Sequence, residues 1–308
     1  MPKISVILPT FNGERYIAQS IQSVIDQTEQ DWELIIVNDC STDNTLAICN
    51  EFAKKDNRIT VVSNKTNKKL PASLNVGFAR ATGKYFTWTS DDNYYHPEAL
   101  TMLAGYLDCH PKTDLVSMDF NFMNENDELM ESYDASFRYK RCAAALLIGS
   151  NVGAAFMYRK TIADAVGEYD VNTFCAEDYD FWCRIALAGR IDYTSDRIYV
   201  YRRQSQSLTA TKKDQVRKKT NIIKRKYADE FFARFNFTAW DRAKFYALVL
   251  KETPARYVFR IAVIKAYRTF VGTLCGMIFY PKLRRHIRAS LLANDKFSFS
   301  HPNKEQSL

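Results

Sequence analysis

Two adjacent carboxylates, Asp91 and Asp92, are the residues of this sequence whose types and spacing best suit chemistry. They follow residues 84–89, a segment typical of a strand. Neighbouring carboxylates at the end of a strand repel each other unless a cation compensates their charge. Magnesium and manganese bind one or two carboxylates together with substrate phosphates. The pair therefore predicts a site for a divalent cation and a phosphate group. The alternative is an ordinary solvated turn.

The segments that would position this pair alternate between strand and helix. Continuous apolar runs, as expected of strands buried on both faces of a sheet, occur at residues 4–8, 33–37, 59–63 and 84–89. Helices are predicted between and after them, at residues 14–27, 46–54, 71–81 and 97–107. This alternation predicts right-handed βαβ units in an open α/β sheet.

Polar residues cluster beyond the ends of the predicted strands. Thr10, Phe11 and Asn12 follow the first strand, Asp39 follows the second, and Asp91 follows the fourth. Ligands of open α/β sheets bind beyond the carboxyl ends of the strands. We therefore expect these residues to surround one binding site.

The rest of the chain predicts mixed structure followed by a basic, helical region. Strand-like segments occur at residues 115–122, 151–158 and 198–201, and Glu177 and Asp178 open a helix that ends at Gly189. Residues 211–308 contain 22 Lys and Arg against 7 Asp and Glu, whereas the preceding residues contain 21 against 28. The net charge of +8 thus combines an acidic module with a basic module suited to an anionic surface.

Taken in order, the motifs resemble those of family-two glycosyltransferases with the GT-A fold, over residues 3 to about 209. The segments that carry the resemblance are Pro9-Thr10-Phe11-Asn12, Val37-Asn38-Asp39, Ser41-Thr42-Asp43, Asp91-Asp92 and Glu177-Asp178. Their joint order and their positions at strand ends make the match specific. The resemblance implies an α/β fold with a GT-A-like, mostly parallel (mixed) sheet flanked by helices. It places a catalytic domain at residues 1–210, followed by a basic helical region at residues 211–308.

The resemblance implies transfer of a sugar from a nucleotide diphosphate sugar to a carbohydrate or lipid-linked acceptor, by single displacement with inversion. A uridine diphosphate sugar is the favoured donor. Mg²⁺ or Mn²⁺ would absorb the charge that develops on the leaving diphosphate. The implied setting is bacterial surface polysaccharide assembly. One alternative is a catalytically silent protein that binds sugar nucleotides or membrane on the same scaffold. A nucleotidyltransferase is disfavoured because its glycine-rich first loop is absent.

The resemblance also implies roles for the residues of the donor site. The DxD motif of the family aligns with Ser90-Asp91-Asp92, so Asp92 is assigned to the metal ion. Asp91 would assist it or contact the nucleotide ribose. Asp39 would accept a hydrogen bond from the nucleotide base, and its alternative role is to stabilise a turn. The loop that encloses the base would contain Thr10, Phe11 and Asn12, with a core aromatic as the alternative for Phe11.

Asp178 aligns with the family's catalytic carboxylate and is the implied general base. A positioned carboxylate that takes the proton of an attacking hydroxyl group accelerates transfer about 10²–10⁴-fold. The N-terminus of a helix also stabilises carboxylates, so N-capping is the alternative. For Glu177 a structural or acceptor-binding role is favoured.

Two departures from the family pattern concern positive charge at the donor site. Leu74 stands where the family has arginine, and Lys69 or the lysine before it is assigned to supply the missing cation. Gln204 stands where the family has histidine, and Arg202 or the following arginine is assigned to neutralise the diphosphate. The alternative for this pair is two surface arginines.

The basic region suggests an association with membrane. Residues 256–292 combine apolar side chains with Lys and Arg, as in an interfacial segment on anionic lipid. An ordinary helical subdomain carries equal weight, and residues 269–280, the most apolar run, are too few to cross a bilayer. No nucleic-acid partner is expected, because no recognition motif accompanies the charge. Seven scattered cysteines and no secretory leader predict a cytoplasmic protein, peripheral on the cytoplasmic membrane face if the segment binds lipid.

Overall fold

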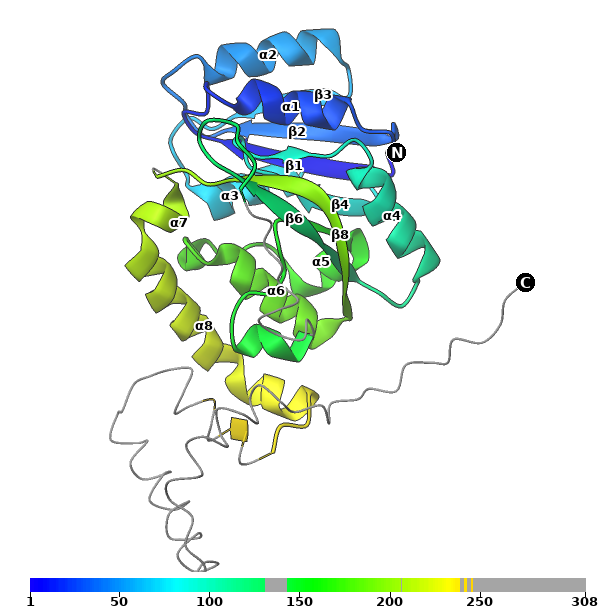
Figure 1. Ribbon diagram of the computed structural model, residues 1–308, viewed down its shortest axis with the longest axis vertical. Coiled ribbons are helices and arrows are strands. Elements are labelled where there is room, and N and C mark those ends of the chain that lie inside the picture. The colour runs from blue at the N-terminus through cyan, green and yellow to red at the C-terminus, as the bar shows by residue number, and fades with distance from the viewer. Residues whose placement is uncertain (131–142, 206, 239–240, 243–244, 246–308) are drawn as a thin grey trace, which may run out of the picture. The chain divides into compact units, whose positions relative to one another are not determined.

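The computed structural model describes residues 1–130, 143–205, 207–238, 241–242 and 245, which form a mixed sheet covered by helices (Figure 1). Its eight strands lie in the order β3-β2-β1-β4-β7-β6-β8-β5. Their bounds are β1 Ile4–Thr10, β2 Trp32–Asn38, β3 Ile59–Ser63, β4 Tyr85–Trp88, β5 Tyr94–Tyr95, β6 Leu115–Met123, β7 Ala155–Arg159 and β8 Ile191–Arg202. The first four strands pair in parallel, and antiparallel pairing begins at β7. The predicted fold class is confirmed.

The parallel half of the sheet forms because its strands are apolar on both faces. In β1, Ile4, Val6 and Leu8 join one hydrophobic core, whereas Ile7 joins the other. All seven residues of this strand are buried. Burying both faces requires helices on both sides of the sheet. The carboxyl ends of β1, β2 and β4 consequently meet at one edge, which is where polar residues follow them.

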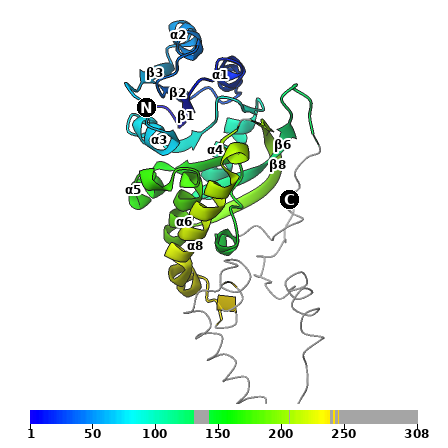
Figure 2. The ribbon, with the colours of Figure 1, turned by 90° about the vertical axis from the view of Figure 1, so that its left-hand side faces the viewer.

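Helices cover both faces of the sheet (Figure 2). The core on one face includes residues of α1, α2 and α4, and the core on the other includes residues of α3, α5, α6 and α8. The helices span α1 Ile17–Ile25, α2 Thr45–Lys55, α3 Leu70–Phe78, α4 Ala99–Cys109, α5 Lys160–Val166, α6 Glu177–Ala188, α7 Leu208–Thr211 and α8 Lys213–Arg234. Two 3₁₀ turns, Ala143–Leu147 and Val171–Thr173, complete the described elements.

All of these elements belong to one compact unit. Helix α8 lies beside α6 in both views (Figures 1 and 2) and buries Ile223, Phe231 and Phe232 in the same core. The predicted division into domains at residue 210 stays a prediction. The predicted interfacial segment, residues 256–292, lies outside the described residues. Among those that are described, no helix is long and apolar enough to cross a bilayer.

Candidate active site

Asp91 lies where the loops that follow β1 and β4 meet. Thr10 Oγ1 donates a 2.5 Å hydrogen bond to Asp91 Oδ2, and the backbone N–H of Phe11 donates to the same carboxylate. Gly13 permits this close approach, because a Cβ atom there would lie 2.3 Å from Asp91 Oδ2. Burial and the neighbouring charge of Asp92 raise the pKa of Asp91 to about 7. A carboxylate that is so costly to ionise is stabilised by a nearby cation.

Asp92 contacts the segment that follows β8. Gln204 Nε2 donates a 2.6 Å hydrogen bond to Asp92 Oδ2, and burial raises the pKa of Asp92. Over the described part of the chain, no three His, Cys, Asp or Glu side chains are arranged to hold a metal ion by themselves. Mg²⁺ and Mn²⁺ need only one or two carboxylates when substrate phosphates supply further oxygens. Asp91 and Asp92 therefore fit such an ion in the presence of a diphosphate.

Arg202 supports the Asp92 loop from a buried position, with 1% of its surface exposed. Its Nε donates to the backbone oxygen of Asp92 at 3.0 Å, and its terminal nitrogens donate to Asp127 Oδ1 at 2.6 Å and Gln19 Oε1 at 2.7 Å. Its guanidinium group also lies 4.2 Å from the ring centre of Tyr16. All three guanidinium nitrogens are thus engaged with protein groups. The predicted contact between Arg202 and a diphosphate stays a prediction.

Asp39 joins the end of β2 to the loop before α3. Its Oδ1 accepts hydrogen bonds of 2.8 Å from Asn64 Nδ2 and from the backbone N–H of Lys68, and its Oδ2 accepts one of 2.8 Å from the backbone N–H of Lys69. The backbone N–H of Asp39 donates to the oxygen of Thr10. Each carboxylate oxygen has two acceptor positions, so Oδ2 can accept another donor, as the predicted contact with a nucleotide base requires.

The loops around the site contain backbone strain. Five non-glycine residues of these loops have positive φ: Asn12 (56°), Cys40 (67°), Lys69 (71°), Asp127 (65°) and Cys175 (79°). Such residues cost about 1–3 kcal/mol each and gather at functional sites. Phe11 is 49% exposed, although it is a large aromatic residue, and Lys69 is also exposed. Phe11 is therefore not the core aromatic of the alternative interpretation.

Glu177 and Asp178 occupy the first turn of α6. Asp178 Oδ1 accepts a 2.6 Å hydrogen bond from the backbone N–H of Tyr179. Burial raises the pKa of both carboxyl groups, and the charge of Asp178 raises that of Glu177 further. Within the described residues, the buried Glu177 Oε2 has no hydrogen-bond partner. An unpaired buried acceptor of this kind suits a ligand that brings its own donor.

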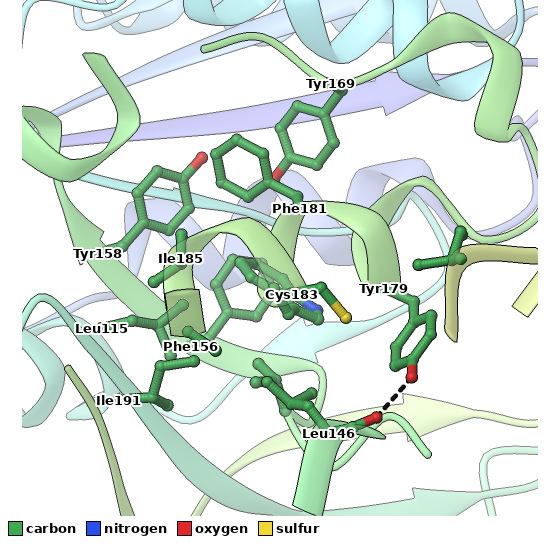
Figure 3. Close-up of a cluster of buried hydrophobic side chains, with 14 of the residues drawn as sticks. Leu115, Leu146, Phe156, Tyr158, Tyr169, Tyr179, Phe181, Cys183, Ile185 and Ile191 are labelled. Atoms are coloured by element: carbon green, nitrogen blue, oxygen red, sulfur yellow. Dashed lines mark hydrogen bonds between the residues drawn. The ribbon is translucent and has the colours of Figure 1, made fainter. Parts of the chain in front are cut away.

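Tyr169 connects this helix to β4, the strand that precedes the aspartate pair. Trp88 Nε1, at the end of β4, donates a 3.1 Å hydrogen bond to the hydroxyl group of Tyr169. The ring of Tyr169 stacks on Phe181 of α6 at 4.2 Å between ring centres (Figure 3). Asn75 of α3 holds the backbone of Tyr169 through two hydrogen bonds. Helix α6, the end of β4 and helix α3 are therefore parts of one packed structure.

The sequence does not predict several contacts of the candidate site. The hydrogen bond from Gln204 to Asp92 joins residues 112 positions apart, and that from Trp88 to Tyr169 joins residues 81 positions apart. Trp88 and Tyr169 belong to no local motif. The only signal in the sequence was the departure from the family's histidine at residue 204. The sequence did indicate that Asp43 shapes the entry to a helix, and Asp43 Oδ1 accepts from the backbone N–H of Thr45 at the start of α2.

Comparison with protein families and curated proteins gives a consistent result. The model of glycosyl transferase family 2 matches residues 5–167. The putative glycosyltransferase EpsE of Bacillus subtilis is 42% identical over 110 residues, which are 35% of this chain and 40% of EpsE. The putative teichuronic acid biosynthesis glycosyltransferase TuaG of the same organism is 38% identical over 99 residues, 32% of this chain and 39% of TuaG. The matches thus span about two fifths of these relatives.

Solved structures share the fold at low sequence identity. S. aureus TarS 1–349 in complex with UDP-GlcNAc superimposes with a TM-score of 0.58 at 21% identity, over 79% of this chain and 78% of that chain. The Pyrobaculum calidifontis mannosyltransferase PcManGT, in complex with GDP-Man and Mn²⁺, superimposes with a TM-score of 0.58 at 17% identity, over 95% and 80%. The described sheet and helices therefore have the GT-A arrangement.

Proposed function

Because this chain belongs to glycosyl transferase family 2, we propose that it transfers a sugar from a nucleotide diphosphate sugar to a carbohydrate or lipid-linked acceptor. The observation that carries this proposal is the meeting of Thr10, Asp91 and Asp92 at the carboxyl ends of β1 and β4. A uridine diphosphate sugar is the favoured donor, and TarS, which shares the fold, binds UDP-GlcNAc. The name of TuaG supports a role in bacterial surface polysaccharide synthesis.

Residues at the ends of β1, β2 and β4 would bind the donor. Phe11, which is half exposed, would stack on the nucleotide base, and Asp39 would accept a hydrogen bond from its edge. Asn12 and Lys69 would complete this side of the site, and Arg202 would hold the loop beneath the diphosphate. Asp92, assisted by Asp91, would hold Mg²⁺ or Mn²⁺. Such an ion, when bound, offsets the charge that develops on the leaving diphosphate.

The first turn of α6 would act on the acceptor. Asp178 would remove the proton of the attacking hydroxyl group, and its raised pKa brings it closer to the value at which a base works best near neutral pH. The unpaired Oε2 of Glu177 would accept a hydrogen bond from another acceptor hydroxyl group. Attack on the face of the sugar opposite the diphosphate inverts the anomeric configuration. A single base and a single displacement suffice for this outcome.

The second candidate is a catalytically silent protein that binds sugar nucleotides on the same scaffold. Ser90 and Gln204, which replace two polar residues of the family pattern, support it. Asp39, Asp92 and Asp178 are all present and count against it. The candidates differ in whether bound donor is turned over, because a silent binder releases donor unchanged.

A donor screen tests the proposal. Incubation with uridine, guanosine and thymidine diphosphate sugars should release nucleoside diphosphate from one class of donor in the presence of Mn²⁺. Asp39→Asn should raise the dissociation constant for that donor about 10-fold, because it removes the charge from the proposed contact with the base. Turnover at saturating donor should change little. Calorimetry and a coupled phosphate assay measure the two quantities.

Asp43→Asn is the matched control, since Asp43 follows the same strand but has no proposed contact with the donor. Its carboxylate accepts hydrogen bonds from the backbone N–H groups of Glu14, before α1, and of Thr45, at the start of α2. If the wild-type protein binds a donor but neither releases nucleoside diphosphate nor transfers sugar, the silent candidate is favoured. Equal donor affinity of the wild-type protein and of Asp39→Asn would exclude Asp39 as a residue that binds the donor.

We also propose that residues 1–210 carry the catalytic site and that the basic region binds anionic lipid. Full-length protein should float with vesicles that contain anionic phospholipid at low salt, and removal of the residues after 255 should abolish flotation. The physical reason is the combination of Lys, Arg and apolar residues at 256–292. Neutral vesicles are the control. Failure of the full-length protein to float at low salt would leave the region as a structural subdomain.

A further inference from the structure

Helices α6 and α8 both follow the residues that the family model matches, and α8 lies beside α6 (Figures 1 and 2). Lys212 Nζ, directly before α8, lies 4.9 Å from the ring centre of Phe174. Lys219 Nζ donates a 2.6 Å hydrogen bond to the backbone oxygen of Asn172. Gln215 Oε1 lies 3.9 Å from Cys175 Sγ. The start of α8 therefore contacts the loop that leads to Asp178.

This loop needs external support because its backbone is strained. Cys175 has a φ of 79°, which is unusual for a residue with a side chain. A strained residue keeps its conformation only when the surrounding structure enforces it. Cys175 precedes Asp178 by three positions, so relaxation of the loop would change where α6 begins and where its first carboxylates point. The contacts from α8 hold the residues on which this conformation depends.

A second set of contacts fixes the first turn of α6 itself. Asp180 is a fully buried residue of this turn, and its backbone N–H donates to the oxygen of Ala176, directly before α6. Tyr227 of α8 donates a 2.9 Å hydrogen bond to Asp180 Oδ1, and Lys226 Nζ lies 3.2 Å from the same oxygen. Arg184 of α6 binds the other oxygen at 2.8 Å. Helix α8 therefore binds one of the two carboxylate oxygens of Asp180, a residue two positions after Asp178.

We infer that α8 is a positioning element for the general base, with Tyr227 and Lys226 as the positioning residues that act through Asp180. The inference rests on the proposed role of Asp178. Proton removal depends on the geometry between the carboxylate and the hydroxyl group, and a misplacement of about 1 Å costs up to about 100-fold in rate. Donor binding depends on the ends of β1, β2 and β4, which α8 does not support through these contacts. Loss of the α8 contacts should therefore lower turnover without weakening donor binding.

The two helices also provide a matched control. Arg234 of α8 donates 2.9 Å hydrogen bonds to the backbone oxygens of Ala186 and Gly189, at the opposite end of α6. Arg234→Met removes contacts between the same helices but leaves the first turn of α6 untouched. Tyr227→Phe and Lys226→Met remove only the hydroxyl and ammonium groups at Asp180 and keep the apolar parts of both side chains.

The experiment compares the Tyr227→Phe, Lys226→Met double variant with Arg234→Met in the full-length protein. We expect kcat of the double variant to fall between about 10- and 100-fold, with unchanged affinity for uridine diphosphate by calorimetry. Both variants should lower the melting temperature, because each removes contacts between α6 and α8. Arg234→Met should nevertheless keep kcat within about two-fold of the wild type. Lys226→Arg, which preserves the ion pair, should retain turnover. Equal losses of kcat in the double variant and in Arg234→Met would overturn the inference.

A double-mutant cycle that includes Asp178→Asn separates positioning of the base from general stabilisation of the fold. If α8 acts through Asp178, the double variant should cost nothing further in an Asp178→Asn background, because no base remains to be positioned. An additive loss would contradict positioning.

If the wild-type protein transfers no sugar, the proposed function fails, and hydrogen exchange still tests the inference. Amides of residues 172–180 should then exchange faster in the double variant than in Arg234→Met, and equal exchange would overturn it.

Discussion

Replacing Asp178 with asparagine should lower turnover by about 10²-fold or more while leaving donor binding intact. Asparagine has the shape of aspartate and can still accept the hydrogen bond from the backbone N–H of Tyr179, so packing at the start of α6 is preserved. It cannot take a proton. The proton transfer matters chiefly in the transition state, so the loss falls on kcat. Steady-state transfer assays and calorimetry with uridine diphosphate measure the two effects.

The pH dependence of turnover gives this prediction a second readout. Asp178 must be ionised to act as a base, and burial raises its pKa. Turnover of the wild-type protein should therefore fall as the pH is lowered through this raised pKa, from the neutral range towards the usual range of a carboxylic acid. Because Asp178 and Glu177 interact, the apparent value belongs to the pair. The acidic limb attributable to Asp178 should be absent from Asp178→Asn.

Asp164→Asn is a suitable control, because Asp164 forms an exposed ion pair with Lys160 on α5, and such pairs contribute little. It should leave transfer unchanged. Near-normal turnover of Asp178→Asn would exclude Asp178 as the base. A product with retained anomeric configuration would exclude the single displacement.

The sequence predicts the parallel half of the fold well because local patterns determine it. Residues 4–8 and 59–63 are short apolar runs, and they lie in β1 and β3. The pattern does not predict where elements end: the helix expected at 14–27 is α1 at Ile17–Ile25, preceded by a turn in which the backbone N–H of Tyr16 donates to the backbone oxygen of Gly13. Strand β8 begins at Ile191, seven residues before the expected start at 198. Its first half is polar and pairs with β6, which no local pattern indicates.

The candidate site, like the fold, has parts that local sequence predicts and parts that depend on tertiary contacts. Asp91 and Asp92 are adjacent in sequence, and their position at a strand end marks them without any tertiary information. The sequence predicts that Arg202 contacts the diphosphate or lies on the surface, but the structure buries it under the Asp92 loop. Side chains from distant segments hold it there. Such contacts depend on how β8 packs against α1 and the loop after β6. A local motif therefore identifies which residues carry charge, and only the fold determines which charges remain available to a ligand.

Replacing Asp92 with asparagine should abolish the coupling between divalent metal and nucleotide. In the wild-type protein, Mn²⁺ should tighten binding of uridine diphosphate by about 10-fold or more, within the usual range of coupling between two ligands. The physical reason is mutual dependence, since two carboxylates alone hold Mn²⁺ weakly and the diphosphate supplies its remaining oxygen ligands. Calorimetry of uridine diphosphate with and without Mn²⁺ measures the factor. Coupling is reciprocal, so electron paramagnetic resonance of free Mn²⁺ should show the same factor for the effect of uridine diphosphate on metal binding.

Gln204→Ala provides the control for Asp92→Asn, because it removes the 2.6 Å hydrogen bond to Asp92 Oδ2 but keeps the carboxylate charge. If charge is what binds the metal, Gln204→Ala should retain most of the coupling, whereas Asp92→Asn should bind uridine diphosphate equally with and without Mn²⁺. If loss of the loop's geometry were responsible instead, the two variants would behave alike. Equal affinity of the wild-type protein for uridine diphosphate in both conditions would exclude Asp91 and Asp92 as a metal site.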